Sequence, residues 1–301
     1  MYLTCEKIND EKGDERMRYK YLRFPGGKGK AVTFSYDDGC PEDKRFSETL
    51  TQYGLKGTFN LNGFEFKGDS GLSPEEVKEY LVEKGHEIAV HGYSHRASGA
   101  QRLVEGIKDV LDNRLELEEL FGGIVRGMAY PDSGITRMAN GTKYEDVKQY
   151  LTELGIVYSR TLGGDNDKFE LPADWHAWMP TAHHNNPQIM DWIQKFIDFE
   201  TNPKTGYRKT SAPMLFYIWG HSYEFERKNN WEHLTEICEK LSGRDDIWYA
   251  TNIEIYDYVE GYMNLKWSAN GARVYNPNLF SVWFDVDGTT YEVKPGQTMN
   301  L

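Results

Sequence analysis

A repeated alternation of β-prone runs and helical stripes between residues 31 and 262 most constrains how this chain can fold. The β-prone runs are rich in β-branched and aromatic residues, and apolar residues three or four apart follow them. This order is typical of βα units around a parallel sheet. Examples are the expected strands "AVTFSY", "GTFNL" and "EIAV", and the expected helical stripe formed by Leu103, Ile107, Leu111 and Leu115.

The number of repeats favours a barrel over an open sheet. The sequence contains about seven βα units, and parallel β/α barrels are built from eight units over about 250 residues. We therefore predict an α/β fold, a closed or nearly closed (β/α) barrel with a small C-terminal β-meander.

The chain changes character near residue 263. Asn-Gly, Asn-Pro, Asp-Gly and Pro-Gly pairs separate short β-prone runs there, and no helical stripe is present. We expect an N-terminal extension over residues 1–30, the barrel over residues 31–262, and a small β-meander over residues 263–301 that packs on the barrel.

Composition excludes several classes of partner. The 35 lysines and arginines face 47 acids, and a formal net charge of −12 argues against a nucleic-acid or anionic-membrane surface. No stretch approaches the roughly 20 apolar residues of a membrane span. Cys5, Cys40 and Cys238 lie far apart and form no Cys-x-x-Cys pair, so neither a disulfide framework nor a thiolate zinc site is indicated. With no recognisable leader, we expect a cytoplasmic protein; a secreted one is the alternative if a leader was removed.

Ionisable side chains follow several expected strands. The stretch "SYDDG" places Asp37 and Asp38 at the end of the first strand, although a simple Asp-Gly turn is the alternative. "EIAVHGYSH" adds His91 and His95, whose four-residue spacing lets one ion bridge two imidazoles on a helical turn. "MLFYIWGHSYEF" adds His221. Functional groups of parallel barrels lie at the carboxyl ends of strands, so we expect these five side chains at one end.

These motifs resemble those of the polysaccharide deacetylase (NodB-homology) family of metal-dependent carbohydrate esterases. "SYDDG" matches the family's first motif, "HGYSH" its second and "WGH" its last, in the family's order over residues 31 to about 262. The resemblance implies a distorted (β/α) barrel, and it implies an acetylated oligosaccharide or polysaccharide as substrate.

The resemblance also implies a role for each of the five side chains. Asp38, His91 and His95 would hold one divalent ion, with Asp37 as general base and His221 as general acid. One carboxylate and two neutral imidazoles leave open positions on a zinc-like ion, whose bound water has a pKa near 7. Zinc is the first expectation, because the ligands are rich in imidazole, and cobalt or nickel suit the same set.

The third motif departs from the family pattern. The family usually has Arg-x-Pro-Tyr-Gly, whereas "RGMAYPDSG" matches only if Arg126 is displaced or if Ala129 fills the arginine position. The first reading makes Arg126 the residue that orients Asp37. Either Tyr130 or Asp132 is then expected to supply a backbone N–H to the oxyanion.

The fourth motif, on the substrate side, corresponds to "ADWHAW", with Asp174, Trp175 and Trp178. Packing in the core and stacking on a sugar both remain open for these tryptophans. The following "PTAHH" offers His183 or His184 to the rim of the site instead.

These observations predict a metal-dependent hydrolytic deacetylase that acts on N-acetylated carbohydrate, with O-acetylated carbohydrate as the second choice. A catalytically silent sugar-binding or regulatory protein on the same barrel is the alternative. The presence of all five side chains weighs against that alternative.

Overall fold

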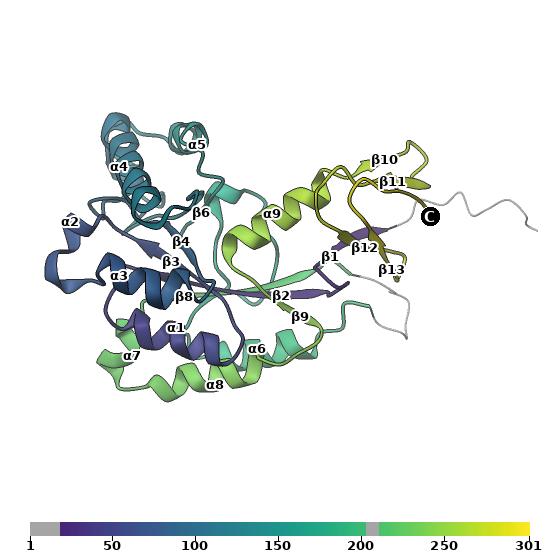
Figure 1. The fold of residues 1–301 in the computed structure, drawn as a ribbon, viewed down its shortest axis with the longest axis horizontal. Coiled ribbons are helices and arrows are strands. Elements are labelled where there is room, and N and C mark those ends of the chain that lie inside the picture. Colours follow the sequence, from purple (N-terminus) through teal and green to yellow (C-terminus); the bar gives the residue numbers. More distant parts are fainter. Residues whose placement is uncertain (1–18, 203–210) are drawn as a thin grey trace, which may run out of the picture.

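A curled parallel sheet forms the centre of the computed structural model, which describes residues 19–202 and 211–301 (Figure 1). Seven strands follow one another in the order β6-β5-β4-β3-β2-β8-β7, and β9 pairs with β2. The curled sheet is a half-barrel, which confirms the predicted α/β fold as a distorted (β/α) barrel. The strands are β2 (Lys30–Asp37), β3 (Gly57–Leu61), β4 (Glu87–Val90), β5 (Gly127–Ala129), β6 (Tyr158–Arg160), β7 (Ala182–His183), β8 (Met214–Gly220) and β9 (Ile247–Tyr249).

Strand β2 organises this sheet. It is buried along its whole length, polar Thr33, Ser35 and Asp37 included, because the sheet is covered on both faces. It pairs with β8 over residues 30–36, whereas β9 pairs with residues 30–32 and β3 with residues 34–37. β2 therefore holds three neighbouring strands in register and ends at Asp37.

The segment between β6 and β7 narrows the opening of the half-barrel. Trp178 forms a parallel bridge with Arg160 of β6, and its N–H donates a 3.1 Å hydrogen bond to the carbonyl of Ser159. A few residues later, Ala182 and His183 pair with β8. One short segment thus contacts both edge regions of the curled sheet.

Helices cover the outside of the sheet, with α4 and α5 on one side and α1, α6 and α8 on the other (Figure 1). Two of them begin at capping boxes, formed by Ser73 with Glu76 and by Thr251 with Glu254. The helices are α1 (Asp43–Gln52), α2 (Phe64–Lys67), α3 (Pro74–Val77), α4 (Leu103–Phe121), α5 (Tyr144–Glu153), α6 (Ile189–Asp198), α7 (Tyr223–Lys228), α8 (Trp231–Leu241) and α9 (Asn252–Met263), with short helical turns η1 (Gly68–Ser70), η2 (Lys78–Val82), η3 (Ser98–Ala100) and η4 (Trp175–Ala177). Within the described ranges, every helix is too short or too polar to cross a membrane.

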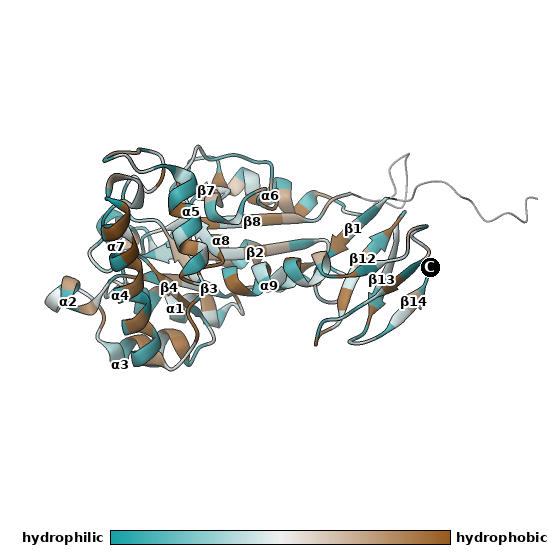
Figure 2. Ribbon diagram, turned by 90° about the horizontal axis from the view of Figure 1, so that it is seen from above, coloured by the Kyte–Doolittle hydropathy of each residue, from teal (hydrophilic) through white to brown (hydrophobic). Residues whose placement is uncertain are grey.

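Two small antiparallel sheets lie at the far end of α9 (Figure 2). The expected β-prone runs after residue 263 supply most of their strands. One sheet also takes β1 from the segment expected as the N-terminal extension, whose residues 1–18 lie outside the described residues. The sheets are β1 (Lys20–Arg23), β12 (Val282–Val286) and β13 (Thr289–Val293), and β10 (Lys266–Trp267), β11 (Arg273–Tyr275) and β14 (Thr298–Asn300).

Tyr258 of α9 joins the sheet of β1, β12 and β13 to the barrel, and removal of its hydroxyl tests that link. Its hydroxyl donates to the carbonyl of Arg23 and accepts from the backbone N–H of Trp283, both at 2.9 Å. Because Tyr258→Phe leaves two buried backbone groups unsatisfied, we expect the free energy of unfolding in urea to fall by about 1–3 kcal/mol. Tyr275→Phe is the control, since that side chain is exposed and its hydroxyl bonds to no described residue. An equal fall in the free energy of unfolding of both variants would contradict the link.

Candidate active site

Three strands deliver the predicted side chains to one end of the half-barrel. Asp37 is the last residue of β2, His91 follows β4, and His221 follows β8. The chain turns sharply after Asp37, because Asp38 and Gly39 have left-handed backbones with φ of 79° and 60°. The two neighbouring carboxylates therefore diverge: Asp37 is buried, whereas Asp38 is partly exposed.

Asp38, His91 and His95 form a cluster that fits a metal ion. Asp38 Oδ1 lies 3.6 Å from His91 Nε2 and 3.4 Å from His95 Nε2. Ligand atoms that bind one tetrahedral ion at about 2.1 Å lie about 3.4 Å from each other. The other ring nitrogen of His91, Nδ1, lies 2.8 Å from the carbonyl of Ala129, which directs Nε2 toward the cluster. The predicted ligands are therefore brought together in a geometry that suits zinc-like ions.

The surroundings of Asp38 and His91 favour the protonation states that bind a cation, whereas the hydrogen bond with Asp38 raises the pKa of His95. Burial raises the pKa of Asp38, but the hydrogen bond from His95 and the nearby imidazoles outweigh it and hold the pKa below its usual value. Burial lowers the pKa of His91. An ionised carboxylate and a neutral imidazole are the forms that ligate metals.

Asp37 is held by two side chains that the motifs did not identify. Its Oδ2 accepts a hydrogen bond from Arg160 Nη2, and its Oδ1 accepts one of 2.8 Å from Asn60 Nδ2. Arg160 is the last residue of β6 and is 1% exposed, with its guanidinium 4.7 Å from the centre of the Trp219 ring. The rule that functional groups end parallel strands would have identified Arg160, because it directly follows the expected strand "IVYS".

Arg126 does not orient Asp37, and that expectation is wrong. Arg126 directly precedes β5, so it lies at the amino end of its strand, opposite the end that carries Asp37. Its two terminal nitrogens bind the carboxylate of Asp257 at 2.9 and 2.5 Å. Arg160, and not Arg126, is the arginine that contacts Asp37.

Of the two residues expected to stabilise the oxyanion, Tyr130 is already engaged. Its backbone N–H donates a 3.0 Å hydrogen bond to the carbonyl of Arg160, and its buried hydroxyl donates to the carbonyl of His176. Asp132 lines the same cavity as Asp37, and its backbone N–H donates to no residue in the described part of the chain. The structure therefore leaves Asp132 as the candidate donor.

The "ADWHAW" residues pack away from the metal cluster, so their expected place on the substrate side needs correction. Asp174 accepts hydrogen bonds of 2.8 Å from Tyr144 and from Lys148. Trp178 is 1% exposed, and the Trp175 ring meets it edge to face. None of the three lines a cavity beside Asp38. For these tryptophans, the structure selects core packing over sugar stacking.

His221 lies opposite the aspartates with a carboxylate behind it. Its Nε2 is 4.0 Å from Asp37 Oδ2 and 3.8 Å from Asp38 Oδ2. Its Nδ1 is 2.9 Å from Glu224 Oε1, a contact that the sequence motifs did not reveal. Burial lowers the pKa of His221, but Glu224 and the two aspartates outweigh it and raise the pKa above its usual value.

His183 and His184 lie behind Glu224 rather than at the metal cluster. The Nε2 atom of each ring is 3.4 Å from Glu224 Oε2. These three side chains resemble a second metal site, but the Asn185 amide nitrogen already lies 2.5 Å from Glu224 Oε2 and 2.8 Å from His184 Nε2. Asn185 therefore fills the space that an ion would take.

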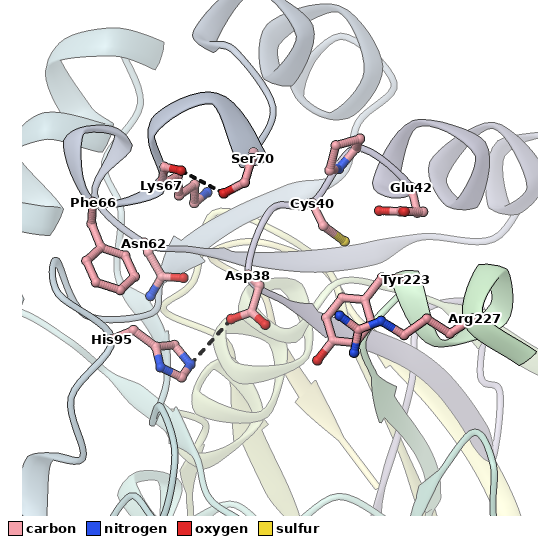
Figure 3. Close-up of a pocket in the computed structure, with 12 residues that line it drawn as sticks. Asp38, Cys40, Glu42, Asn62, Phe66, Lys67, Ser70, His95, Tyr223 and Arg227 are labelled. Atoms are coloured by element: carbon pink, nitrogen blue, oxygen red, sulfur yellow. Dashed lines mark hydrogen bonds and ion pairs between the residues drawn. The ribbon is translucent and has the colours of Figure 1, made fainter.

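Two cavities meet at the metal cluster. One, of about 650 Å³, lies on the side of α2 and α7 (Figure 3). The other, of about 420 Å³, contains Asp37 and His221. Asp38, His95 and Tyr223 line both. An extended ligand can thus cross the cluster of Asp38, His91 and His95 with Asp37 and His221 beside it.

Several solved structures are similar to this chain in fold. A putative polysaccharide deacetylase from Mycobacterium smegmatis is 18% identical and has a TM-score of 0.55, over 81% of this chain and 94% of that one. A family 4 acetyl xylan esterase from Clostridium thermocellum, in complex with a cobalt ion, is 17% identical over 75% of this chain and 90% of that one, with a TM-score of 0.46. A family 4 pseudoenzyme from Bacillus anthracis is 15% identical over 78% and 67%, also with a TM-score of 0.46.

No curated protein matches the sequence significantly. A family model does: residues 25–158, which include Asp37, Asp38, His91 and His95, match the model described as polysaccharide deacetylase. The resemblance of this chain to the polysaccharide deacetylase family, predicted from its motifs, is therefore confirmed.

Proposed function

We propose that this protein is a metal-dependent hydrolase that removes acetyl groups from N-acetylated carbohydrate. The observation that carries the proposal is an arrangement in and beside the cavity that contains Asp37 and His221. Arg160 binds Asp37, Glu224 binds His221, and the cluster of Asp38, His91 and His95 lies between them. An amine is a poor leaving group unless it is protonated. The Glu224-supported His221 therefore favours an amide substrate over an ester.

Asp38, His91 and His95 are the residues that would hold the ion. Zinc is the first choice, and cobalt or nickel suit the same donors. When bound there, a divalent ion supplies Lewis-acid polarisation of the acetyl carbonyl and a lowered pKa for water.

Asp37 acts as the general base. The hydrogen bonds from Arg160 and Asn60 fix its carboxylate in position. The attacking water gives its proton to this carboxylate, and the arginine limits movement of the base during the transfer. Asp132 lines the same cavity, and its backbone N–H is the group that we assign to the developing oxyanion.

His221 acts as the general acid. Its Nδ1–H donates to Glu224, so its Nε2 faces the groove and carries the proton given to the leaving nitrogen. Burial raises the pKa of Glu224, but hydrogen bonds from His183 and His221 outweigh it and hold that pKa low. Glu224 therefore stays ionised and stabilises the imidazolium form of His221.

A sugar-binding or regulatory protein without turnover remains the second candidate. Acetate release separates the two when the pure protein is mixed with acetylated chito-oligosaccharide, peptidoglycan fragments and acetyl-xylan, with and without Zn²⁺ or Co²⁺. Binding without acetate release on all three would favour the second candidate.

The cytoplasmic location stays a prediction. Fractionation of cells that express the full-length gene tests it. Recovery of the protein outside the cell would contradict it.

Replacing Asp37 or Asp38 by asparagine should reduce activity for different reasons. Asp37→Asn should keep the metal and the fold but lose about 10²–10⁴-fold in kcat, the usual contribution of a positioned base. Asp38→Asn should weaken metal affinity, and excess metal should restore part of the activity. Paired elemental analysis and kinetics check both. If the two residues only build a turn, both variants should stay active. Near-normal turnover by Asp37→Asn would contradict its role as general base.

The two arginines provide a matched test of which one supports the base. Arg160→Gln removes the cation from the buried Asp37 carboxylate, and we expect kcat to fall by about 10–100-fold. Arg126→Gln breaks only the partly exposed pair with Asp257, so its kcat/KM should stay within about twofold. Similar losses in both variants would show that the effect is not specific to the base.

Glu224 should matter only when the leaving group needs a proton. Glu224→Gln should lower kcat on an N-acetylated sugar by at least about tenfold but leave p-nitrophenyl acetate hydrolysis nearly unchanged, since that phenolate departs unprotonated. Metal content should not change. Glu226→Gln is the control on the same helix, because Glu226 Oε2 bonds to Trp231 rather than to His221. Equal losses on both substrates would indicate a structural role for Glu224.

A further inference from the structure

The larger cavity beside the metal cluster carries two cationic side chains on opposite walls (Figure 3). Lys67 ends α2 on one wall, and Arg227 of α7 lies on the other. Asp38 lies between them and also lines the cavity of the base and the acid. At about 650 Å³, this space lies within the roughly 300–1,000 Å³ of small-molecule sites. A saccharide with its acetyl group at Asp38 therefore extends past both cations.

The position of Lys67 depends on two glycines. A Cβ atom on Gly39 would lie 2.3 Å from Lys67 Nζ, and one on Gly71 would lie 2.7 Å from its Cδ. These glycines leave a channel that places the ammonium beside the turn that carries Asp38. A larger residue at either place would displace the Lys67 side chain from this position.

The Lys67 ammonium lies 5.1 Å from the centre of the Phe64 ring but has no hydrogen-bond partner among the described residues. Its Nζ is buried. Burial lowers its pKa to about 8, against the attraction of Asp43 and Asp38, so the side chain is still mainly charged at neutral pH. A buried charge without a hydrogen bond costs free energy, and neither the fold nor the proposed mechanism uses this one.

Arg227 is the second cation without an anionic partner. Its guanidinium lies 4.1 Å from the centre of the Tyr223 ring, which orients it along the cavity wall. It forms no ion pair with a carboxylate in the described ranges, and Glu42, which lines the same cavity, pairs with neither cation. A chain with a net charge of −12 thus keeps two unpaired cations next to its reactive groups.

We propose that this cavity binds a carboxylate of the substrate. The preferred substrate is then an acidic N-acetylated saccharide, in which a sugar with a uronic acid or a lactyl carboxylate adjoins the sugar that loses its acetyl group. This inference rests on the proposed deacetylase function and names its substrate class. A carboxylate offers two oxygens with one shared charge, and charge-assisted hydrogen bonds from lysine and arginine are stronger than those to neutral hydroxyls.

Matched oligosaccharides test the proposal. N-acetylchitotetraose is the neutral substrate, a hyaluronan tetrasaccharide carries uronic acids, and a tetramer of alternating N-acetylglucosamine and N-acetylmuramic acid carries lactyl groups. The protein should show a kcat/KM about tenfold higher on at least one acidic substrate, mainly through KM. Which acidic substrate is preferred identifies the source of the carboxylate.

Two variants assign the preference to the cavity. Lys67→Met, which keeps the aliphatic stem, and Arg227→Gln should each raise KM on the acidic substrate about three- to tenfold. Each should leave the neutral substrate unchanged. Lys56→Met is the control, because Lys56 pairs with Glu254 away from this cavity. If Lys67→Met fails to fold, the exposed Arg227→Gln carries the test. Equal kcat/KM on neutral and acidic substrates, or equal losses on both, would overturn the proposal.

Binding measurements separate this proposal from the proposed function. If no oligosaccharide releases acetate, calorimetry with the same three ligands decides. Tighter binding of an acidic ligand that is lost in Arg227→Gln would support the carboxylate site although deacetylation had failed. Equal affinities, or no binding of any ligand, would overturn the site.

Discussion

The buried ion pair between Arg160 and Asp37 is the interaction on which the rest of the site depends. The two side chains are 1% and 4% exposed, and they come from β6 and β2, which are not neighbours in the sheet. Only a curled sheet brings these two strand ends within hydrogen-bond distance. Losing one partner of such a pair leaves an uncompensated buried charge, at a cost of about 3–5 kcal/mol. The curvature of the barrel and the position of the base are therefore coupled.

The same curvature brings side chains from three strands together around Asp38. His221 leaves β8 on one side of β2, whereas His91 leaves β4 beyond β3 on the other. Asp38 lies between them because its left-handed backbone turns it away from Asp37, and His95 also has a left-handed backbone, with φ of 52°. Left-handed residues other than glycine cost free energy and concentrate at functional sites. The left-handed turn thus places the Asp38 carboxylate 3.6 Å from His91 Nε2 and 3.8 Å from His221 Nε2.

The strand-end rule predicted the central site, and its failures have physical causes. It identified Asp37 and His221 because side chains at the carboxyl ends of parallel strands all lie at the same end of the barrel. It failed for Arg126 because a motif alignment outweighed strand direction. Sequence also predicted helix α4 but on the wrong face: Leu115 of the expected stripe is 55% exposed, whereas Leu117 is fully buried. Residues four apart turn 400°, so such a stripe drifts about 40° per step around a helix of 3.6 residues per turn.

Three consecutive residues explain why β2 ends in Asp-Asp-Gly. Asp37 continues the strand and remains in the interior, where hydrogen bonds from Arg160 and Asn60 fix its carboxylate. Asp38 turns outward to two imidazoles, so the same type of side chain serves as a ligand rather than a base. Gly39 completes the turn, and its missing Cβ leaves the space beside Asp38 that Lys67 Nζ occupies. A turn alone requires only the glycine's backbone freedom, whereas this turn also divides two carboxylates between two environments and places a cation next to them.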